Sequence, residues 1–222
     1  MNLINYWPEF IVFAFAHILS LISPGPDFLM VVRSSLRYRR SSAYWVAFGI
    51  SCGECVHVGY SLAGIGLLIS QSLWLFSLLK YLGGAYLIYI GIQSLRARKE
   101  APELLLAESR NAQVLEDPSA MKAFSQGFLT NVLNAKAAFF TISFFTVLVS
   151  PETPFVIQLG YGIFIQLSTL GWFLLVASFL THQQIQGKFL GMKHWIERTA
   201  GSVLIVLGIK LALSDINSMV EG

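Results

Sequence analysis

The sequence predicts an all-α integral membrane protein with six transmembrane helices in two inverted three-helix repeats. Three observations support this. Of the 222 residues, 55% are hydrophobic and only 12% are charged, which is about half the charged fraction of a soluble domain. Six nearly uncharged stretches each reach the roughly 20 residues that a helix needs to cross a bilayer. The third and sixth stretches also share a glycine pattern. A chain this apolar lacks the polar side chains to cover a soluble globule.

The six predicted spans are separated by one long polar segment. A segment in hydrocarbon must satisfy its backbone hydrogen bonds internally, so the spans are helices rather than open strands. They cover residues 7–32, 42–69, 72–95, 123–150, 153–181 and 196–213. The polar segment, 97–122, carries mixed charges and prolines and is predicted to be a cytoplasmic linker. It divides a single transporter domain, 1–222, into a first repeat (1–96) and a second repeat (123–222).

Outside the predicted spans, basic residues are confined to alternate loops, which predicts the orientation. The loops near 70–71 and 150–153 contain no Lys or Arg. The other three loops contain Arg33, Arg37, Arg39, Arg40, Arg96, Arg98, Lys99, Arg110, Lys122, Lys188, Lys193 and Arg198. Because basic loops remain in the cytoplasm, both termini are predicted on the opposite, outer side. The net charge of +3 comes from these anchors and does not indicate nucleic-acid binding.

The third and sixth spans carry the signal of an internal repeat. Residues 84–92 and 201–209 share the pattern Gly-x-x-Leu-Ile-x-(Ile/Leu)-Gly-Ile. Three spans per half place the second half in the membrane in the opposite orientation, which is the inverted-repeat plan of many secondary transporters. The alternative is that two glycine-faced packing helices have converged on one pattern.

The first span of each half is interrupted. In span one, Pro24 and Pro26 remove backbone donors and Gly25 permits an irregular turn. Asp27 is expected to cap the helix that follows. Residues 131–136 take the corresponding place in span four. Freed backbone groups at membrane depth are tolerated where they line a cavity or are buried in protein, so paired interruptions favour a binding site over two structural kinks.

Few ionisable side chains lie inside the predicted spans. A charge at that depth costs at least about 2.5–3.5 kcal/mol, so it usually marks function. Carboxylates and an imidazole are suited to exchanging protons, whereas amides and an ammonium suit a substrate carboxylate. The predicted substrate and proton path therefore comprises Asp27, Glu54, His57, Asn131, Asn134 and Lys136. His17 either lines the same path or bonds a neighbouring helix.

Residues 52–57, Cys-Gly-Glu-Cys-Val-His, offer four potential metal ligands. At about 3.6 residues per turn, a regular helix separates Cys52 and Cys55 from Glu54 and His57, so all four do not reach one ion. Glu54 and His57 either share a proton or simply satisfy each other. A metal-ion exporter using this region, or a membrane thiol-redox protein using the cysteines, is the alternative function. The sequence shows no cofactor motif, nucleotide loop or nucleophile elbow, so it predicts no enzyme.

Several motifs together resemble the LysE/RhtB family of bacterial amino-acid exporters. The resemblance runs from span one to Gly208. Its motifs are Ser-Pro-Gly-Pro-Asp-Phe at 23–28, Gly-x-x-x-Gly at 49–53, Lys-Tyr-Leu-Gly-Gly-Ala-Tyr-Leu at 80–87 and Gly-Phe-Leu-Thr-Asn-x-x-Asn-x-Lys at 127–136. The runs at 172–178 and 195–196 are most similar to the threonine/homoserine branch.

The resemblance implies export of an amino acid or related zwitterion across the bacterial inner membrane by proton antiport, with periplasmic termini. It implies functional roles for Pro24, Gly25, Pro26, Asp27, Asn131, Asn134 and Lys136. One departure is Ala135, which stands where the family usually has proline, so the second break is expected to be less sharp. The glycine-rich faces leave open both internal packing and a homodimer.

Overall fold

The computed structural model describes residues 3–23, 25–71, 73–96, 116–150, 152–180, 194–195, 198–199 and 201–209, and regular structure within these ranges is helical throughout. A short 3₁₀ helix, η1 (Leu3–Tyr6), leads into α1 (Trp7–Ile22). There follow α2 (Pro26–Arg37), α3 (Arg40–Gln71), α4 (Leu73–Leu95), α6 (Ala120–Val132), α7 (Ala135–Val147) and α8 (Phe155–Leu180). Residues 201–209 form a further helical stretch.

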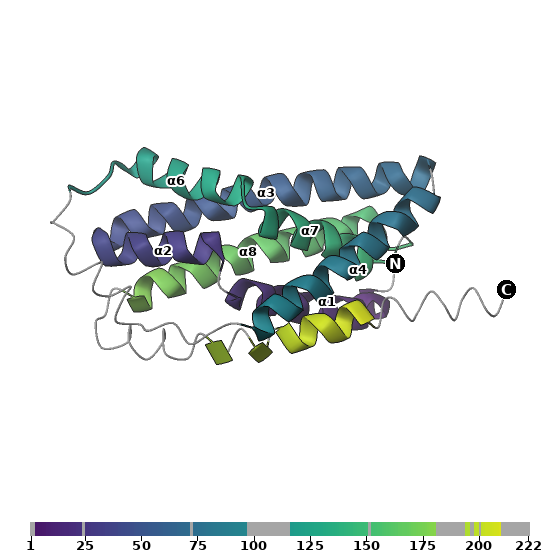
Figure 1. Ribbon diagram of the computed structural model, residues 1–222. Coiled ribbons are helices and arrows are strands. Elements are labelled where there is room, and N and C mark those ends of the chain that lie inside the picture. Colours follow the sequence, from purple (N-terminus) through teal and green to yellow (C-terminus); the bar gives the residue numbers. More distant parts are fainter. Residues whose placement is uncertain are drawn as a thin grey trace.

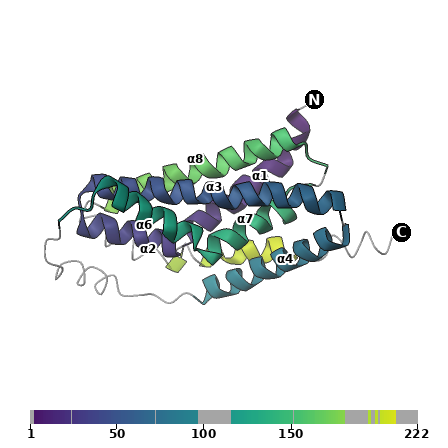
Figure 2. The same ribbon diagram turned by 90° about the horizontal axis from the view of Figure 1, so that it is seen from above.

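When each of the pairs α1–α2 and α6–α7 is taken as one bent segment, successive segments run in opposite directions along one long axis (Figure 1). α3 crosses the whole length of the molecule, and α8 lies beside it in both views (Figure 2). The pairs α1–α2 and α6–α7 each traverse the molecule in two shorter pieces. Both of their breaks lie near the middle of the long axis, which brings the two interrupted regions of the sequence to one level.

The length and apolar character of the helices fit membrane spans. Over Phe155–Phe179, α8 is long and apolar enough to cross a bilayer alone. The pairs α1–α2 and α6–α7 meet the same condition when each is taken as one bent span, which makes up to three such spans in the described part of the chain. The bend is 50° in the first pair and 57° in the second.

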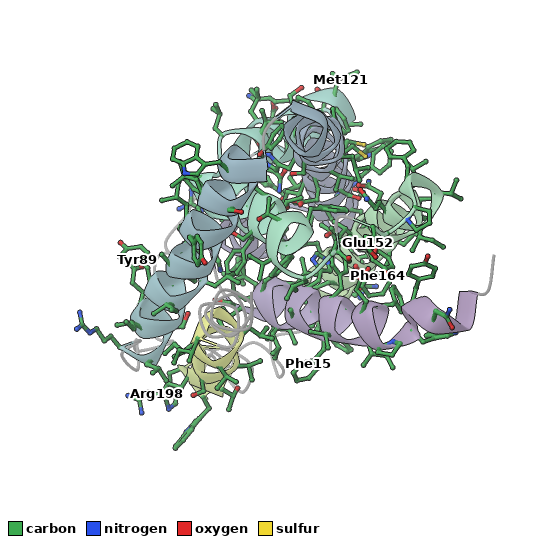
Figure 3. All side chains as sticks on the ribbon, turned by 90° about the vertical axis from the view of Figure 1, so that its right-hand side faces the viewer. Phe15, Tyr89, Met121, Glu152, Phe164 and Arg198 are labelled. Atoms are coloured by element: carbon green, nitrogen blue, oxygen red, sulfur yellow. The ribbon has the colours of Figure 1, made fainter. Side chains whose placement is uncertain are left out.

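Apolar side chains cover the outside of the bundle. Seen along its axis in Figure 3, Phe15, Tyr89 and Met121 lie on the periphery, where they are 56%, 55% and 71% exposed. Many buried side chains, by contrast, are polar, including two carboxylates and two imidazoles. An apolar exterior around a polar interior suits a protein whose surroundings are hydrocarbon rather than water.

Two apolar clusters divide the interior and leave a polar layer between them. One cluster contains Val58 and Ile165, and the other contains Ile50 and Phe173. Along α3, Glu54 lies midway between Ile50 and Val58. Thr169 occupies the equivalent place on α8, between Ile165 and Phe173. The polar layer is therefore enclosed by an apolar cluster on each side along the bundle axis.

Close helix contacts fix the elements that carry this layer. A Cβ built on Gly49 of α3 would lie 2.1 Å from the carbonyl oxygen of Phe124, and one built on Gly127 of α6 would lie 2.1 Å from that of Val46. The two backbones thus touch at glycines. This contact holds α6 against the first half of α3.

The two stretches that share a glycine pattern also pack on each other. A Cβ on Gly201 would lie 2.6 Å from the carbonyl oxygen of Gly91, and one on Gly208 would lie 2.8 Å from that of Gly84. The residues 84–91 and 201–208 are therefore antiparallel neighbours in direct backbone contact.

Candidate functional site

The second break is made by an asparagine cap. α6 ends at Val132, and the Asn134 side chain accepts a hydrogen bond of 3.0 Å from the backbone N–H of Lys136, so Asn134 is the N-cap of α7. Ala135 is the first residue of α7, where a proline is favoured but its ring is not needed to stop the preceding helix. The expectation that Ala135 softens this break is wrong, since the bend of 57° exceeds the 50° of the first pair.

The first break has a glycine cap. Pro24 lies outside the described residues. Gly25 is extended (φ −148°, ψ −169°) and is the N-cap of α2, and Pro26 follows at the start of the helix. The expectation that Asp27 caps α2 is wrong, because the Asp27 carboxylate accepts its hydrogen bonds from residues of the second break instead. The first break thus presents its acid to the other half of the chain.

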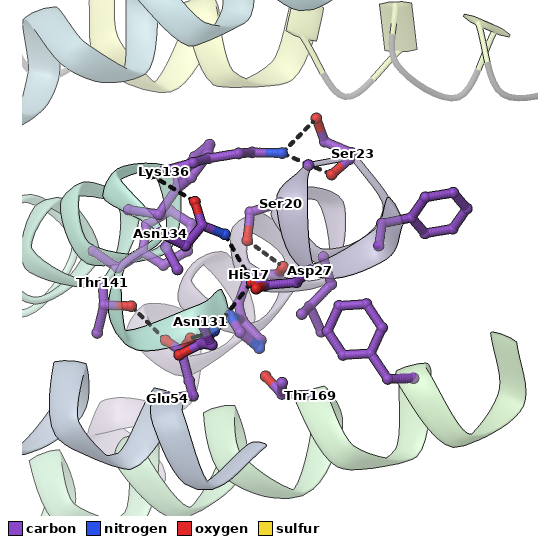
Figure 4. Close-up of a pocket in the computed structure, with 17 residues that line it drawn as sticks. His17, Ser20, Ser23, Asp27, Glu54, Asn131, Asn134, Lys136, Thr141 and Thr169 are labelled. Atoms are coloured by element: carbon purple, nitrogen blue, oxygen red, sulfur yellow. Dashed lines mark hydrogen bonds between the residues drawn. The ribbon is translucent and has the colours of Figure 1, made fainter. Parts of the chain in front are cut away.

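Two buried carboxylates are joined by one amide (Figure 4). The Oδ2 atom of Asp27 accepts hydrogen bonds from the side-chain amides of Asn134 at 2.8 Å and Asn131 at 3.1 Å. The same nitrogen of Asn131 donates to Oε2 of Glu54 at 3.2 Å, and the hydroxyl of Thr141 donates to Oε1 at 2.6 Å. Asp27 and Glu54 are therefore coupled through Asn131.

Lys136 contributes the ammonium of the site and connects the two breaks. Its Nζ donates to the carbonyl oxygen of Ser23 at 2.7 Å and to the hydroxyl of the same residue at 3.1 Å. Ser23 is the C-cap of α1, where the last carbonyls have no partner within the helix and a cation is favoured. A lysine of the second half thus stabilises the helix end of the first half.

His57 contacts the backbone at the C-terminal end of α6. One of its ring nitrogens, Nε2, lies 2.9 Å from the backbone carbonyl oxygen of Asn131, and Nδ1 lies 2.8 Å from the hydroxyl of Tyr60. Because both nitrogens have these partners, the interpretation in which Glu54 and His57 satisfy each other is wrong. A place for His57 in the proton path stays a prediction.

A cavity of about 50 Å³ lies between the two breaks, enough for a few water molecules. It brings together five of the six predicted path residues and adds others from α1, α7 and α8. The polar residues lining it are His17, Ser20, Ser23, Asp27, Glu54, Asn131, Asn134, Lys136, Thr141 and Thr169. His17 and Gly25 border this cavity as well, and a place for His17 in the substrate and proton path stays a prediction.

Sequence reasoning missed four hydroxyl residues at or beside the site: Ser20, Tyr60, Thr141 and Thr169. Each is an uncharged residue in an apolar span. A Thr hydroxyl in a helix usually bonds the carbonyl of its own preceding turn, so its presence carries no signal of a site. The acids and the lysine could be identified because burying a charge in a membrane is costly. Burying a hydroxyl carries no comparable cost, so these residues could not be identified in the same way.

The cysteines stand apart from the acids. The thiol of Cys55 donates to the side-chain oxygen of Gln166 on α8 at 3.1 Å, whereas Glu54 and His57 bond to residues of α6 and α7. Over the described ranges, no three side chains of His, Cys, Asp or Glu gather as they would around a metal ion. Neither the metal-export nor the thiol-redox alternative gains support from this arrangement.

Comparison with known proteins agrees with the resemblance. The family model described as LysE type translocator matches residues 18–215. The threonine efflux protein of Escherichia coli K12 is 34% identical over 207 residues, covering 92% of this chain and 98% of that protein. That of Salmonella typhi is 32% identical over 212 residues with the same coverage, and the uncharacterized membrane protein YrhP of Bacillus subtilis is 27% identical over 206 residues, covering 88% and 94%. No solved structure matches significantly. The chain belongs to the family of LysE-type translocators.

Proposed function

We propose that the protein exports amino acids or closely related small zwitterions across the bacterial inner membrane in exchange for protons. The observation that carries this proposal is that the ammonium of Lys136 and the carboxylate of Asp27 line one cavity where two broken helices meet. A zwitterion requires a cation for its carboxylate and an anion for its ammonium. The similarity to proteins named as threonine efflux proteins makes threonine the first substrate to test.

The proposed topology has six spans, with residues 97–122 as a cytoplasmic linker between the repeats 1–96 and 123–222 and with both termini periplasmic. The alternating helix directions support it (Figure 1). The glycine contacts support the inverted repeat. When residues 84–92 are aligned with 201–209, Gly84 corresponds to Gly201 and Gly91 corresponds to Gly208. Under this correspondence, the contact between Gly91 and Gly201 becomes the contact between Gly208 and Gly84. A two-fold axis between the repeats requires such an exchange.

In the proposed binding mode, the substrate carboxylate takes Lys136 away from the carbonyl of Ser23. The N-terminus of α7, which carries this lysine, adds a favourable dipole for an anion. The substrate ammonium binds Asp27, whose Oδ1 atom is buried and has no hydrogen-bond partner among the described residues. The side-chain oxygen of Asn131 is likewise buried and unpartnered, and it supplies a second acceptor.

Proton exchange follows from competition for the same carboxylate. A substrate ammonium and a proton each neutralise Asp27. Because uncompensated buried charge is costly, the site that bears Asp27, Glu54 and Lys136 favours having either the substrate ammonium or the proton bound. Release of the substrate on the outer side then favours uptake of a proton, which is released inside. Glu54 takes part through their shared donor, Asn131, and His57 is proposed to extend the path towards Tyr60.

The test is transport by the purified protein in liposomes. Radiolabelled threonine and a panel of other amino acids are offered under an imposed pH gradient, with and without a protonophore. We expect gradient-driven transport by the wild type and at least about a tenfold loss in Asp27→Asn, since loss of a buried charge contact costs at least about 1.4 kcal/mol. The control is Asp117→Asn, a carboxylate paired with Arg39 at the surface. Equal transport by Asp27→Asn and wild type, or no amino-acid transport at all, would overturn the proposal.

A further inference from the structure

Four buried polar atoms around the cavity have no hydrogen-bond partner within the part of the chain that the structure describes. Two of them, Asp27 Oδ1 and Asn131 Oδ1, are the acceptors already assigned to the substrate ammonium. The other two are Nε2 of His17 and the hydroxyl of Thr169. The His17 side chain is 4% exposed and that of Thr169 is 1% exposed. Buried polar groups are nearly always hydrogen-bonded, so partners for this second pair are expected to enter the cavity.

The second pair lies away from the groups that bind a zwitterion. In Figure 4, Lys136 and Ser23 lie along one edge of the cavity, Asp27 lies in its middle, and His17 and Thr169 lie towards the opposite edge. A substrate whose carboxylate meets Lys136 and whose ammonium meets Asp27 therefore extends its side chain towards His17 and Thr169.

The surroundings of this pair restrict the size of that side chain. Phe144 and Phe173 line the same cavity, and each belongs to one of the two apolar clusters that enclose the polar layer. The His17 ring is held edge-on against Phe144, with ring centroids 6.2 Å apart, and against Phe164, at 6.0 Å. A short side chain with one polar group fits between these walls, whereas a long or aromatic one meets them.

We infer that His17 and Thr169 form a side-chain subsite that selects amino acids with a short, hydroxyl-bearing side chain. This inference rests on the proposed function. A substrate hydroxyl donates to one member of the pair and accepts from the other, since Thr carries both a donor and an acceptor and His carries one of the two on each ring nitrogen. An analogue without the hydroxyl leaves both protein groups unpaired, which is the strongest basis for discrimination that a polar site offers.

The inference is tested by competition in proteoliposomes, with radiolabelled 2-aminobutyrate as the tracer because it lacks only the hydroxyl of threonine. The measured quantity is the ratio of the half-inhibitory concentrations of unlabelled 2-aminobutyrate and threonine. This ratio is independent of the amount of active protein. We expect at least about 10 for the wild type and less than about 3 for Thr169→Val and for His17→Phe, in which the paired hydroxyl interaction is lost. Thr169→Ser, which keeps the hydroxyl, is expected to retain the high ratio.

The matched control is Thr146→Val. Thr146 is 1% exposed, and its hydroxyl donates to the carbonyl of Ile142 within its own helix, so the ratio should stay at the wild-type value. A wild-type ratio near 1, or a high ratio that Thr169→Val and His17→Phe leave unchanged, would overturn the subsite while amino-acid transport stands. Absence of any amino-acid transport by the wild type would instead remove the proposed function.

Discussion

The ammonium nitrogen of Lys136 lies 2.7 Å from the backbone carbonyl oxygen of Ser23, so a cation from one half of the chain closes a helix that ends in the other half. The reverse connection runs from Asp27, whose carboxylate accepts from the Asn134 cap of α7. Each break thus supplies the group that stabilises the other. A ligand that engages Lys136 or Asp27 therefore acts on both broken helices together, as the proposed transport mechanism requires.

The Lys136→Gln variant tests this connection. It removes the charge that binds both the Ser23 carbonyl and the proposed substrate carboxylate. We expect transport to fall at least about tenfold, because the charge-assisted contact to the substrate carboxylate, which contributes about 1.5–3 kcal/mol, is lost. Thermal unfolding in detergent should also occur several degrees lower. Lys122→Gln, at an exposed position of α6, is the control. Wild-type transport by Lys136→Gln would contradict the assignment.

Gly25→Ala tests the position of the same lysine without touching its charge. A Cβ at Gly25 would lie 3.2 Å from Cδ and 3.5 Å from Nζ of Lys136, while the extended backbone of Gly25 is one that alanine adopts freely. We expect an unfolding temperature close to that of the wild type and transport reduced several-fold, since the lysine must shift by a few tenths of an ångström. Unchanged transport would show that this position has more tolerance than the contacts indicate.

The cap at the second break is tested by two substitutions on neighbouring residues. Ala135→Pro should leave both stability and transport near the wild-type values, because the first position of a helix accepts proline. Asn134→Ala should destabilise the protein by about 0.5–2 kcal/mol through loss of the cap and should abolish transport through loss of a bond to Asp27. Chemical unfolding and threonine transport measure both. Inactivity of Ala135→Pro would mean that the break depends on more than the cap.

The antiparallel glycine contact is tested by Gly91→Ala. Its Cβ would lie 2.7 Å from the carbonyl oxygen of Gly201 and 2.6 Å from Cγ1 of Ile205, so the two helices must separate. Overpacking of this kind costs about 1–3 kcal/mol, and we expect a lower unfolding temperature in detergent. Gly171→Ala adds a Cβ where nothing lies within 4 Å and should have no effect. Equal stability of the two variants would contradict the close contact.

Much of the site could be predicted from the sequence because charge in hydrocarbon is rare. That single cost picked out Asp27, Glu54 and Lys136, and proline and glycine located the first break. All three charged residues line the cavity. Asn131 and Asn134 could be predicted from their amides, and the family resemblance, which the comparisons confirm, implies roles for both.

What the sequence could not provide was the partner of each group. Asp27 looks like a helix cap from its place after Pro26, and only the fold shows that amides from the second break reach it. His57 looks like a partner of Glu54 because the two share a helix face, yet it bonds the carbonyl that the end of α6 leaves open. Contacts between residues more than 70 positions apart depend on helix packing, which no local pattern encodes.

The most direct test of the account is whether the cavity requires both charges of a zwitterion. Transport of radiolabelled threonine in proteoliposomes is measured against increasing threonine, threonine methyl ester and N-acetylthreonine, which lack the carboxylate and the ammonium respectively. If Lys136 and Asp27 bind the two ends of the substrate, threonine competes, and each derivative competes at least about tenfold more weakly, since one charge-assisted contact is lost. Competition by either derivative at threonine-like concentrations would contradict the assignment of the site.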